Sequence, residues 1–150
     1  MGEEYKPLFP AGFHDILESS LEKLFVEPFG SGNERRAALC GGLRAWLREL
    51  KGTGVRAEVW VDGSFVTFKP YPNDVDIVCV IDRGSVYKLD YSMRSRLAGL
   101  FYIPAIKLGY GCHTFYFLGG DADNFNRWAK RFGCGRDGMP KGIPKILVGG

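Results

Sequence analysis

Two short segments carry side chains that suit metal and phosphate chemistry. Gly63 and Ser64 follow a predicted strand, and Asp74 and Asp76 stand at the beginning of the apolar run 75–81. Alternate residues of a strand point to the same face, so the two aspartates are expected to project side by side. Two like charges beside an apolar run are costly unless a cation neutralises them, and carboxylate oxygen suits Mg²⁺. The pair therefore predicts a magnesium site.

The turn at Gly63 and Ser64 suits phosphate. A residue without a Cβ lets backbone N–H groups approach a ligand, and the serine hydroxyl adds a donor. Lys69, a few residues later, is a further candidate for phosphate contact. A phosphate cradle at one strand end and an acid pair at the next are what phosphoryl transfer requires, because its catalysis consists mostly of positioning and charge neutralisation. The residues thus predict binding of a nucleoside triphosphate with Mg²⁺.

The surrounding pattern predicts the elements that position these residues. Helices are indicated by apolar side chains at helical spacing, and strands by short runs rich in β-branched and aromatic residues. In chain order, the predicted elements are helices over 15–27 and 33–50, strands over 57–61 and 75–81, a helix over 85–101, a strand over 113–118, a short helix from 123 and a last strand over 142–148. No linker or repeat interrupts this order, so we expect one α/β (α+β) domain over residues 1–150.

The composition restricts the class of protein. The chain has 150 residues, of which 45% are hydrophobic and 25% are charged. These values exclude extended disorder, a coiled coil and a collagen-like repeat. The net charge of +3 is low for a domain dedicated to nucleic acid, although the C-terminal end is the more basic end.

Cysteine and histidine usage narrows the class further. The four cysteines contain no CxxC pair, which predicts reduced thiols, and His14 and His113 are the only histidines, which argues against a finger-like zinc site. No apolar stretch approaches the ~20 residues that span a bilayer, and the N-terminus lacks a basic-then-apolar signal pattern. The sequence predicts a cytoplasmic protein without a membrane partner.

The motif as a whole resembles the nucleotidyltransferase superfamily of the polymerase-beta type. Its signature is a hydrophobic residue, Gly, then Gly or Ser, a spacer, and an Asp-hydrophobic-Asp segment; here nine residues separate Ser64 from Asp74. Within the superfamily the chain looks like a group of small bacterial proteins related to the AbiEii-type toxins. The segments that carry this resemblance are 58–67, 72–76, 9–14 and 132–143.

The resemblance implies a fold and an activity. The fold is a small mixed β-sheet flanked by helices, the minimal nucleotidyltransferase fold. Asp74 and Asp76 would bind Mg²⁺ or Mn²⁺, and Gly63 and Ser64 would hold the triphosphate. The reaction transfers a nucleotidyl group from a nucleoside triphosphate to a hydroxyl of a protein or RNA acceptor. The toxin relatives imply a toxin-antitoxin or phage-defence setting with an antitoxin-type partner.

The resemblance also implies a third carboxylate on a later strand, and this chain has His113 at that position. Three interpretations follow. His113 ligates the metal or acts as the general base; it marks a degenerate enzyme that still binds nucleotide; or the strand is misaligned and Asp121 or Asp123 is the third acid. The alternative function is therefore a catalytically degenerate nucleotide-binding or protein-interaction module with the same fold.

Simpler interpretations apply to other residues near the motif. Asp62 is expected to cap the turn, as aspartate does elsewhere, rather than to bind metal. Lys141 is a solvated lysine before a strand or a group that neutralises triphosphate. We interpret the three tryptophans and His14 as structural, with Trp60 equally suited to stacking on a base.

Overall fold

The computed structural model describes residues 5–135 and 137–149, and it contains a five-stranded mixed sheet. The strand order is β1-β5-β2-β3-β4, in which β2 runs antiparallel to both neighbours while β1 pairs with β5, and β3 with β4, in parallel. The mixed sheet with flanking helices confirms the predicted fold class. The strands are β1 (Gly12–Asp15), β2 (Ala57–Asp62), β3 (Val75–Ile81), β4 (Cys112–Leu118) and β5 (Gly142–Val148).

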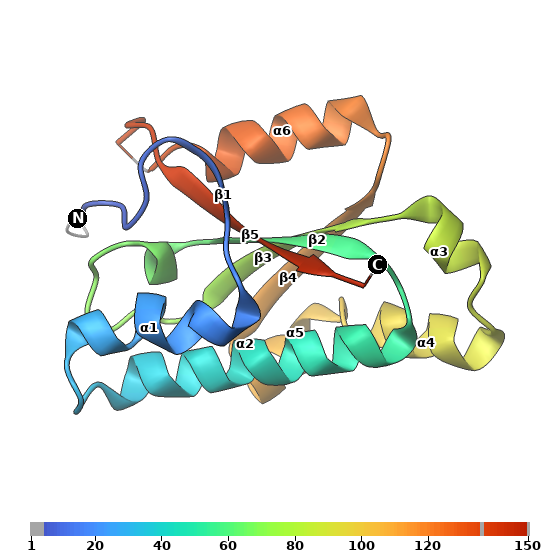
Figure 1. Ribbon diagram of the computed structural model, residues 1–150, viewed down its shortest axis with the longest axis horizontal. Coiled ribbons are helices and arrows are strands. Elements are labelled where there is room, and N and C mark those ends of the chain that lie inside the picture. Colours follow the sequence, from blue (N-terminus) through green and yellow to red (C-terminus); the bar gives the residue numbers. More distant parts are fainter. Residues whose placement is uncertain (1–4, 136, 150) are drawn as a thin grey trace.

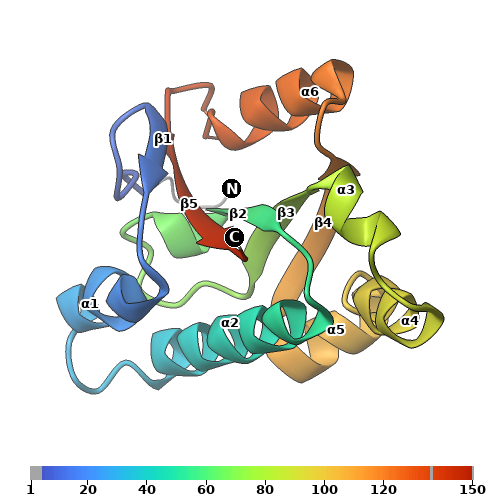
Figure 2. The ribbon, with the colours of Figure 1, turned by 45° about the vertical axis from the view of Figure 1, so that its right-hand side comes forward.

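Helices cover the two faces of the sheet unequally (Figure 1). One face packs against α1 (Leu21–Phe25), α2 (Glu34–Thr53), α4 (Tyr91–Gly99) and α5 (Ile103–Tyr110), whereas α6 (Ala122–Phe132) lies alone over the other (Figure 2). The short α3 (Arg83–Tyr87) follows β3. We call these the α2 face and the α6 face.

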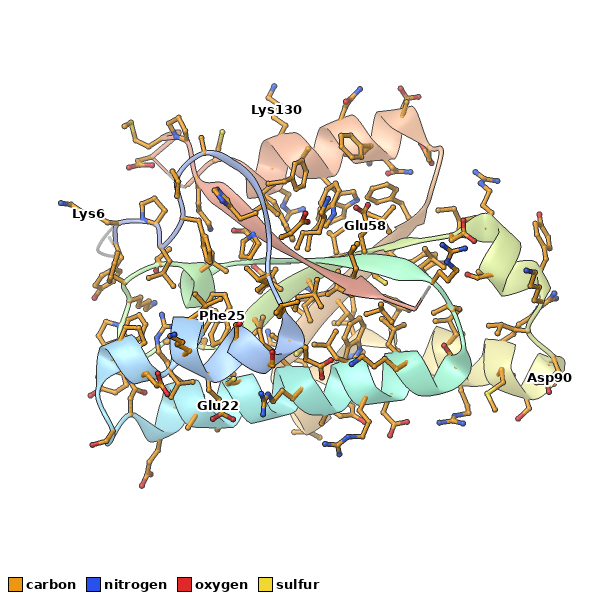
Figure 3. The ribbon with its side chains drawn as sticks, viewed as in Figure 1. Lys6, Glu22, Phe25, Glu58, Asp90 and Lys130 are labelled. Carbon is orange, nitrogen blue, oxygen red and sulfur yellow. The ribbon has the colours of Figure 1, made fainter. Side chains whose placement is uncertain are left out.

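The α2 face holds the larger hydrophobic cluster. Leu43, Trp46 and Leu47 of α2 are fully buried against apolar side chains of the strands. Phe25 points from α1 into the layer between helices and sheet (Figure 3). The cluster on the α6 face is smaller and is built around Trp60. The core prediction for Trp46 and Trp60 is confirmed, since both are buried; Trp128 is partly buried and packs against the smaller cluster.

Helix α2 confirms the strongest helix prediction. Its first residue follows Asn33, whose Oδ1 accepts a hydrogen bond from the backbone N–H of Arg36 (3.0 Å). It ends at Gly54, which has a φ of +89° and so adopts the left-handed conformation that glycine tolerates. The apolar side chains of the helix, between Asn33 and Gly54, face the sheet.

The predicted helix over 15–27 is confirmed only in its central part, and its first residue, Asp15, belongs to a strand that was not predicted. Gly12–Asp15 forms β1, which pairs with β5, and only Leu21–Phe25 is α-helical, between two 3₁₀ turns. The pairing partner of β1 lies more than 120 residues away along the chain, so helical spacing of nearby apolar residues could not reveal it. The conformation of Gly12–Asp15 is therefore determined by tertiary pairing rather than by local propensity.

The predicted helix over 85–101 is also wrong in extent. It divides into α3 and α4, and Asp90 caps α4 by accepting a hydrogen bond from the backbone N–H of Met93 (2.8 Å). Helix α5 is absent from the predicted elements, because a proline that follows a predicted helix closely, as Pro104 does, usually marks the end of that helix. Proline instead occupies the first turn of α5, where its missing N–H needs no partner.

Two smaller expectations can be compared with the described residues. All four cysteines are free thiols, as predicted. His14 Nε2 lies 2.7 Å from the carbonyl oxygen of Pro10, which confirms a structural role in an N-terminal turn. Within the two described ranges, no helix is long and apolar enough to cross a membrane.

Candidate functional site

Three polar side chains lie in a row across strands β2, β3 and β4, at one end of the sheet. Asp62 of β2 is directly opposite Asp76 of β3, and Asp76 is directly opposite His113 of β4. Directly paired residues project from the same face of a sheet. In each strand they lie an even number of positions from members of the smaller cluster, such as Trp60 in β2 and Phe117 in β4, and so point to the same face as that cluster. The row therefore extends the α6 face beyond its apolar part.

The row borders a cavity of about 530 Å³ at the end of the sheet that carries the Gly63–Ser64 turn. This volume lies within the usual ~300–1,000 Å³ of ligand sites. All the residues predicted as site residues line this cavity: Gly63, Ser64, Lys69, Asp74, Asp76 and His113. The structure thus brings together side chains that are separated by up to 50 positions in the sequence.

Asp62 has a partner that the sequence analysis did not assign to it. Its carboxylate forms an ion pair with Lys141, and each of the two side chains is only 9% exposed. Lys141 Nζ also donates to the carbonyl oxygen of Gly63 (3.3 Å). Burial raises the pKa of Asp62 from 3.8 to about 6, although Lys141 acts in the opposite direction. Asp62 also accepts a hydrogen bond from the backbone of Gly63, in keeping with the expected turn cap. The expectation of a solvated lysine is corrected, because Lys141 and Asp62 form one buried pair in the cavity wall.

Asp76 lies at the centre of the row. Its Oδ1 is 3.7 Å from Nδ1 of His113. Burial, and then the charge of Asp74, raise the pKa of Asp76, while His113, Lys141 and Arg131 lower it. A cation in the cavity would relieve the repulsion between the two aspartates, since the charge of Asp74 favours the neutral form of Asp76.

Asp74 and its partner connect the cavity to α5. Lys107 Nζ of that helix lies 3.5 Å from Asp74 Oδ2, and the lysine side chain is 56% exposed. The sequence analysis missed Lys107 because it missed α5. Asp62, Asp74 and Asp76 thus each have a neighbour with a basic side chain, Lys141, Lys107 and His113 respectively.

Gly63 lies against the acid pair as well as in the turn. Its φ is +87°, and a Cβ at this position would lie 2.9 Å from Oδ2 of Asp76. The missing Cβ therefore makes room for the Asp76 carboxylate. This role is additional to the predicted one, which was to let a ligand approach the backbone. The glycine and the second aspartate of the motif are packed against each other.

Helix α6 supplies one further cation to the cavity. Arg131 lines the cavity, and its guanidinium carbon lies 5.2 Å from the ring centre of Trp128 and 6.0 Å from that of Phe115. The sequence did not indicate a functional role for Arg131, which follows Trp128 in an amphipathic helix. Together with Lys69 and Lys141, it gives the cavity three basic side chains.

The structure decides between the candidates for the third position of the row. His113 is paired with Asp76 near the start of β4, whereas Asp121 and Asp123 follow the other end of that strand. Asp121 caps α6, its Oδ1 accepting from the backbone N–H of Asn124 (3.1 Å), and Asp123 is exposed. Neither lines the cavity. The alternative of a misaligned strand is therefore wrong.

The donor set fits a metal ion that is shared with a substrate. In the part of the chain that the structure describes, no three His, Cys, Asp or Glu side chains come together as a metal cage. Mg²⁺ is commonly bound by one or two carboxylates together with substrate phosphates and water. Asp74 and Asp76 match that pattern, and the neighbouring basic side chains match the phosphates.

Comparisons with known proteins identify a family. Residues 3–147 match the model of a family described as "Family of unknown function (DUF6932)". No curated protein and no solved structure matches the chain. Because the family model covers almost the whole sequence, the chain belongs to this family.

Proposed function

We propose that this member of the DUF6932 family is a nucleotidyltransferase, which binds a nucleoside triphosphate with Mg²⁺ or Mn²⁺ and transfers the nucleotidyl group to a hydroxyl of a protein or RNA acceptor. The observation that carries the proposal is the arrangement of the cavity. Asp74 and Asp76 lie beside the Gly63–Ser64 turn, with basic side chains around them. This combination serves anionic phosphates and a divalent cation at once.

The carboxylates and the cations have separate roles in this proposal. Asp74 and Asp76 would hold the divalent cation, which neutralises charge on the transferring phosphoryl group when it is bound. Lys69, Lys141 and Arg131 would contact phosphate oxygens, because all three line the cavity. Lys107 would give up Asp74 when the cation binds; its exposure leaves it free to move into solvent.

His113 would act as the general base. Its Nδ1 faces Asp76, which leaves Nε2 as the nitrogen that can accept a proton from an acceptor. In the proposed step the acceptor oxygen attacks the α-phosphorus, its proton passes to His113, and the bond to the leaving pyrophosphate breaks. A positioned histidine supplies the same base function as a carboxylate near neutral pH.

A second candidate function is a nucleotide-binding or interaction module without turnover. One observation favours it: Asp62 and Asp74 already form ion pairs with Lys141 and Lys107, so part of the negative charge of the site is compensated without a cation. Such a module would bind triphosphate and leave it unchanged. The two candidates differ in whether label is transferred from the triphosphate.

Label transfer from α-³²P-labelled nucleoside triphosphates tests the proposal. The protein would be incubated with each triphosphate, Mg²⁺ or Mn²⁺, and either total RNA or cell lysate. We expect transfer by the wild type, none by Asp76→Asn, and wild-type transfer by Asp123→Asn, which changes an exposed acid outside the cavity. Triphosphate binding without transfer to any acceptor would favour the module.

The acceptor and the biological partner stay predictions. The basic C-terminal end and the cavity are compatible with RNA or with a protein hydroxyl, and the toxin-antitoxin or phage-defence setting comes from the resemblance alone. The label-transfer experiment separates the two acceptor classes, because treatment of the labelled product with ribonuclease removes label from RNA and treatment with protease removes it from protein.

A further inference from the structure

We propose that Arg36 is a positioning residue, which holds the loop 64–70 in the conformation that receives the triphosphate. This inference rests on the proposed function for the identity of the ligand. The loop follows the Gly63–Ser64 turn, and Ser64, Thr67 and Lys69 bring it into the cavity wall. Arg36 itself lies in the first turns of α2 and does not line the cavity.

Arg36 binds three carbonyl oxygens of the loop. Nη1 donates to the oxygen of Phe65 (2.9 Å), and Nη2 donates to those of Thr67 and Lys69 (both 2.7 Å). Nε donates to Lys69 as well (3.1 Å). One remaining bond, from Nη1 to the oxygen of Phe25 (3.0 Å), ties the same group to α1. A single side chain thus connects the loop with two helices.

The burial of this guanidinium distinguishes it from a surface arginine. Arg36 is fully buried, and its guanidinium carbon lies 3.6 Å from the ring centre of Phe29 and 5.2 Å from that of Phe65. Burial lowers the pKa of Arg36 to about 10, so it remains charged at neutral pH. An isolated buried charge is costly unless hydrogen bonds satisfy it. Here neutral backbone carbonyls satisfy it, so the positive charge is not cancelled by a carboxylate among its hydrogen-bond partners.

This arrangement changes the electrostatics of the loop. Carbonyl oxygens carry partial negative charge and would repel a phosphate. Three of them bind the buried Arg36 instead, and the cation behind the loop adds positive potential. Charge in a region of low dielectric acts over longer distances than charge in water. The loop is therefore fixed in shape and favourable for an anion.

Two further contacts restrict the same loop. Asn33, the cap of α2, donates from Nδ2 to the carbonyl oxygen of Pro70 (2.7 Å). On the other side, the N-terminal segment adds backbone bonds from Leu8 N to Val66 O (3.0 Å) and from Phe68 N to Lys6 O (2.9 Å). The start of α2 and the N-terminal segment thus hold the loop from two sides.

Three variants of the full-length protein test this role. Arg36→Lys keeps the charge but replaces the five N–H donors of the planar guanidinium, which reach separate carbonyl oxygens, by the three donors of one ammonium group. Asn33→Asp keeps the helix cap and replaces the donor to Pro70 by a carboxylate oxygen that repels this carbonyl. It leaves Arg36 in place, so it stays informative if Arg36→Lys is poorly folded. Arg35→Lys, at an exposed neighbouring position, is the matched control. Hydrogen exchange by mass spectrometry measures how well the loop is ordered. Titration with a non-hydrolysable nucleoside triphosphate and Mn²⁺ measures the affinity for triphosphate. Titration with Mn²⁺ alone, followed by electron paramagnetic resonance, measures the metal affinity of Asp74 and Asp76.

We expect amides of residues 64–70 to exchange about tenfold faster in Arg36→Lys, and triphosphate affinity to fall about tenfold, each equivalent to one hydrogen bond or more. Mn²⁺ affinity should stay within about twofold of the wild type, a split that general destabilisation would not produce. Asn33→Asp should show the same pattern more weakly, and Arg35→Lys should show neither change.

Each failure has its own meaning. Unchanged exchange in Arg36→Lys, or faster exchange with unchanged triphosphate affinity, overturns the positioning role and leaves the proposed function standing. Equal losses of Mn²⁺ and triphosphate affinity also overturn it, because they indicate a general effect on the fold. Absence of triphosphate binding by the wild type overturns the proposed function and this role together.

Discussion

The two faces of the sheet bury charge in different ways. On the α2 face, the buried Arg36 is satisfied by neutral carbonyl oxygens within the larger apolar cluster. On the α6 face, acids and bases meet around a cavity, and the Asp62–Lys141 pair is buried in its wall. The carbonyl oxygens around Arg36 do not titrate, whereas the protonation of the acid–base pairs depends on pH and on a bound metal or ligand. The α2 face is therefore built for rigidity, and the α6 face for chemistry.

The largest effect is expected for the buried pair. Lys141→Met leaves the Asp62 carboxylate buried without its partner and should lower the free energy of unfolding by about 3–5 kcal/mol at pH 8. Urea denaturation measures this loss. The double variant Asp62→Asn/Lys141→Met should recover most of the stability. A loss below about 1 kcal/mol in the single variant would mean that the pair behaves like a surface ion pair.

The pH dependence of Asp62 should be the next largest effect. Its pKa in the native protein is about 6, above its ordinary value of 3.8, so the native state binds an extra proton between these values. Stability from this group is therefore lost as pH rises. The free energy of unfolding of the wild type minus that of Asp62→Asn should fall by about 2–3 kcal/mol from pH 4 to pH 7. A flat or rising difference would contradict the assignment.

Matched tryptophan substitutions compare the two faces directly. Trp46 is fully buried on the α2 face, and its Nε1 donates to the carbonyl oxygen of Leu100 (3.1 Å). Trp46→Phe should cost about 2 kcal/mol, and Trp128→Phe on the partly open α6 face less than about 1 kcal/mol. Thermal and urea unfolding of both variants would measure the two costs. Equal costs would mean that α6 closes its face as tightly as α2 closes the other.

Two glycines that share a positive φ but differ in ψ provide the finest comparison: ψ is 2° at Gly54 and −172° at Gly63. Gly54 and Gly63 have φ values of +89° and +87°, but only Gly63 has a carboxylate where a Cβ would lie. Alanine should cost about 1 kcal/mol in the left-handed conformation of Gly54 and about 2–3 kcal/mol at Gly63, whose backbone lies in a region essentially confined to glycine. Only Gly63→Ala should also weaken Mn²⁺ binding, because it displaces Asp76. Calorimetric Mn²⁺ titration separates the variants, and equal affinities would show that this contact is unimportant for the metal.

The sequence predicted the parts of the molecule that depend on local pattern. Helix α2 and the strands β2 to β5 follow from periodicity, and the clustering of Gly63, Asp74 and Asp76 follows from the placement of the motif at strand ends. The position of His113 at the site came from the resemblance, which implies a third site residue on a later strand; the pairing of β4 with β3 places it opposite Asp76.

The remainder depends on contacts between distant segments. Strand β1 exists because it pairs with β5. The partners Lys141 and Lys107 could not be assigned without knowing that the last strand lies beside β2 and that a helix begins at Ile103. Arg36 looked like one polar residue of an amphipathic helix. Its role becomes visible only through carbonyl oxygens about 30 residues away.

Calorimetry with a non-hydrolysable nucleoside triphosphate tests the central claim most directly. The wild type, Asp76→Asn and the control Asp123→Asn would each be titrated with and without Mn²⁺. The account predicts Mn²⁺-dependent binding to the wild type and the control, and a loss of about 100-fold or more in Asp76→Asn, as expected for removal of one of two charged metal ligands. Equal binding to all three proteins, or no binding to the wild type, would contradict it.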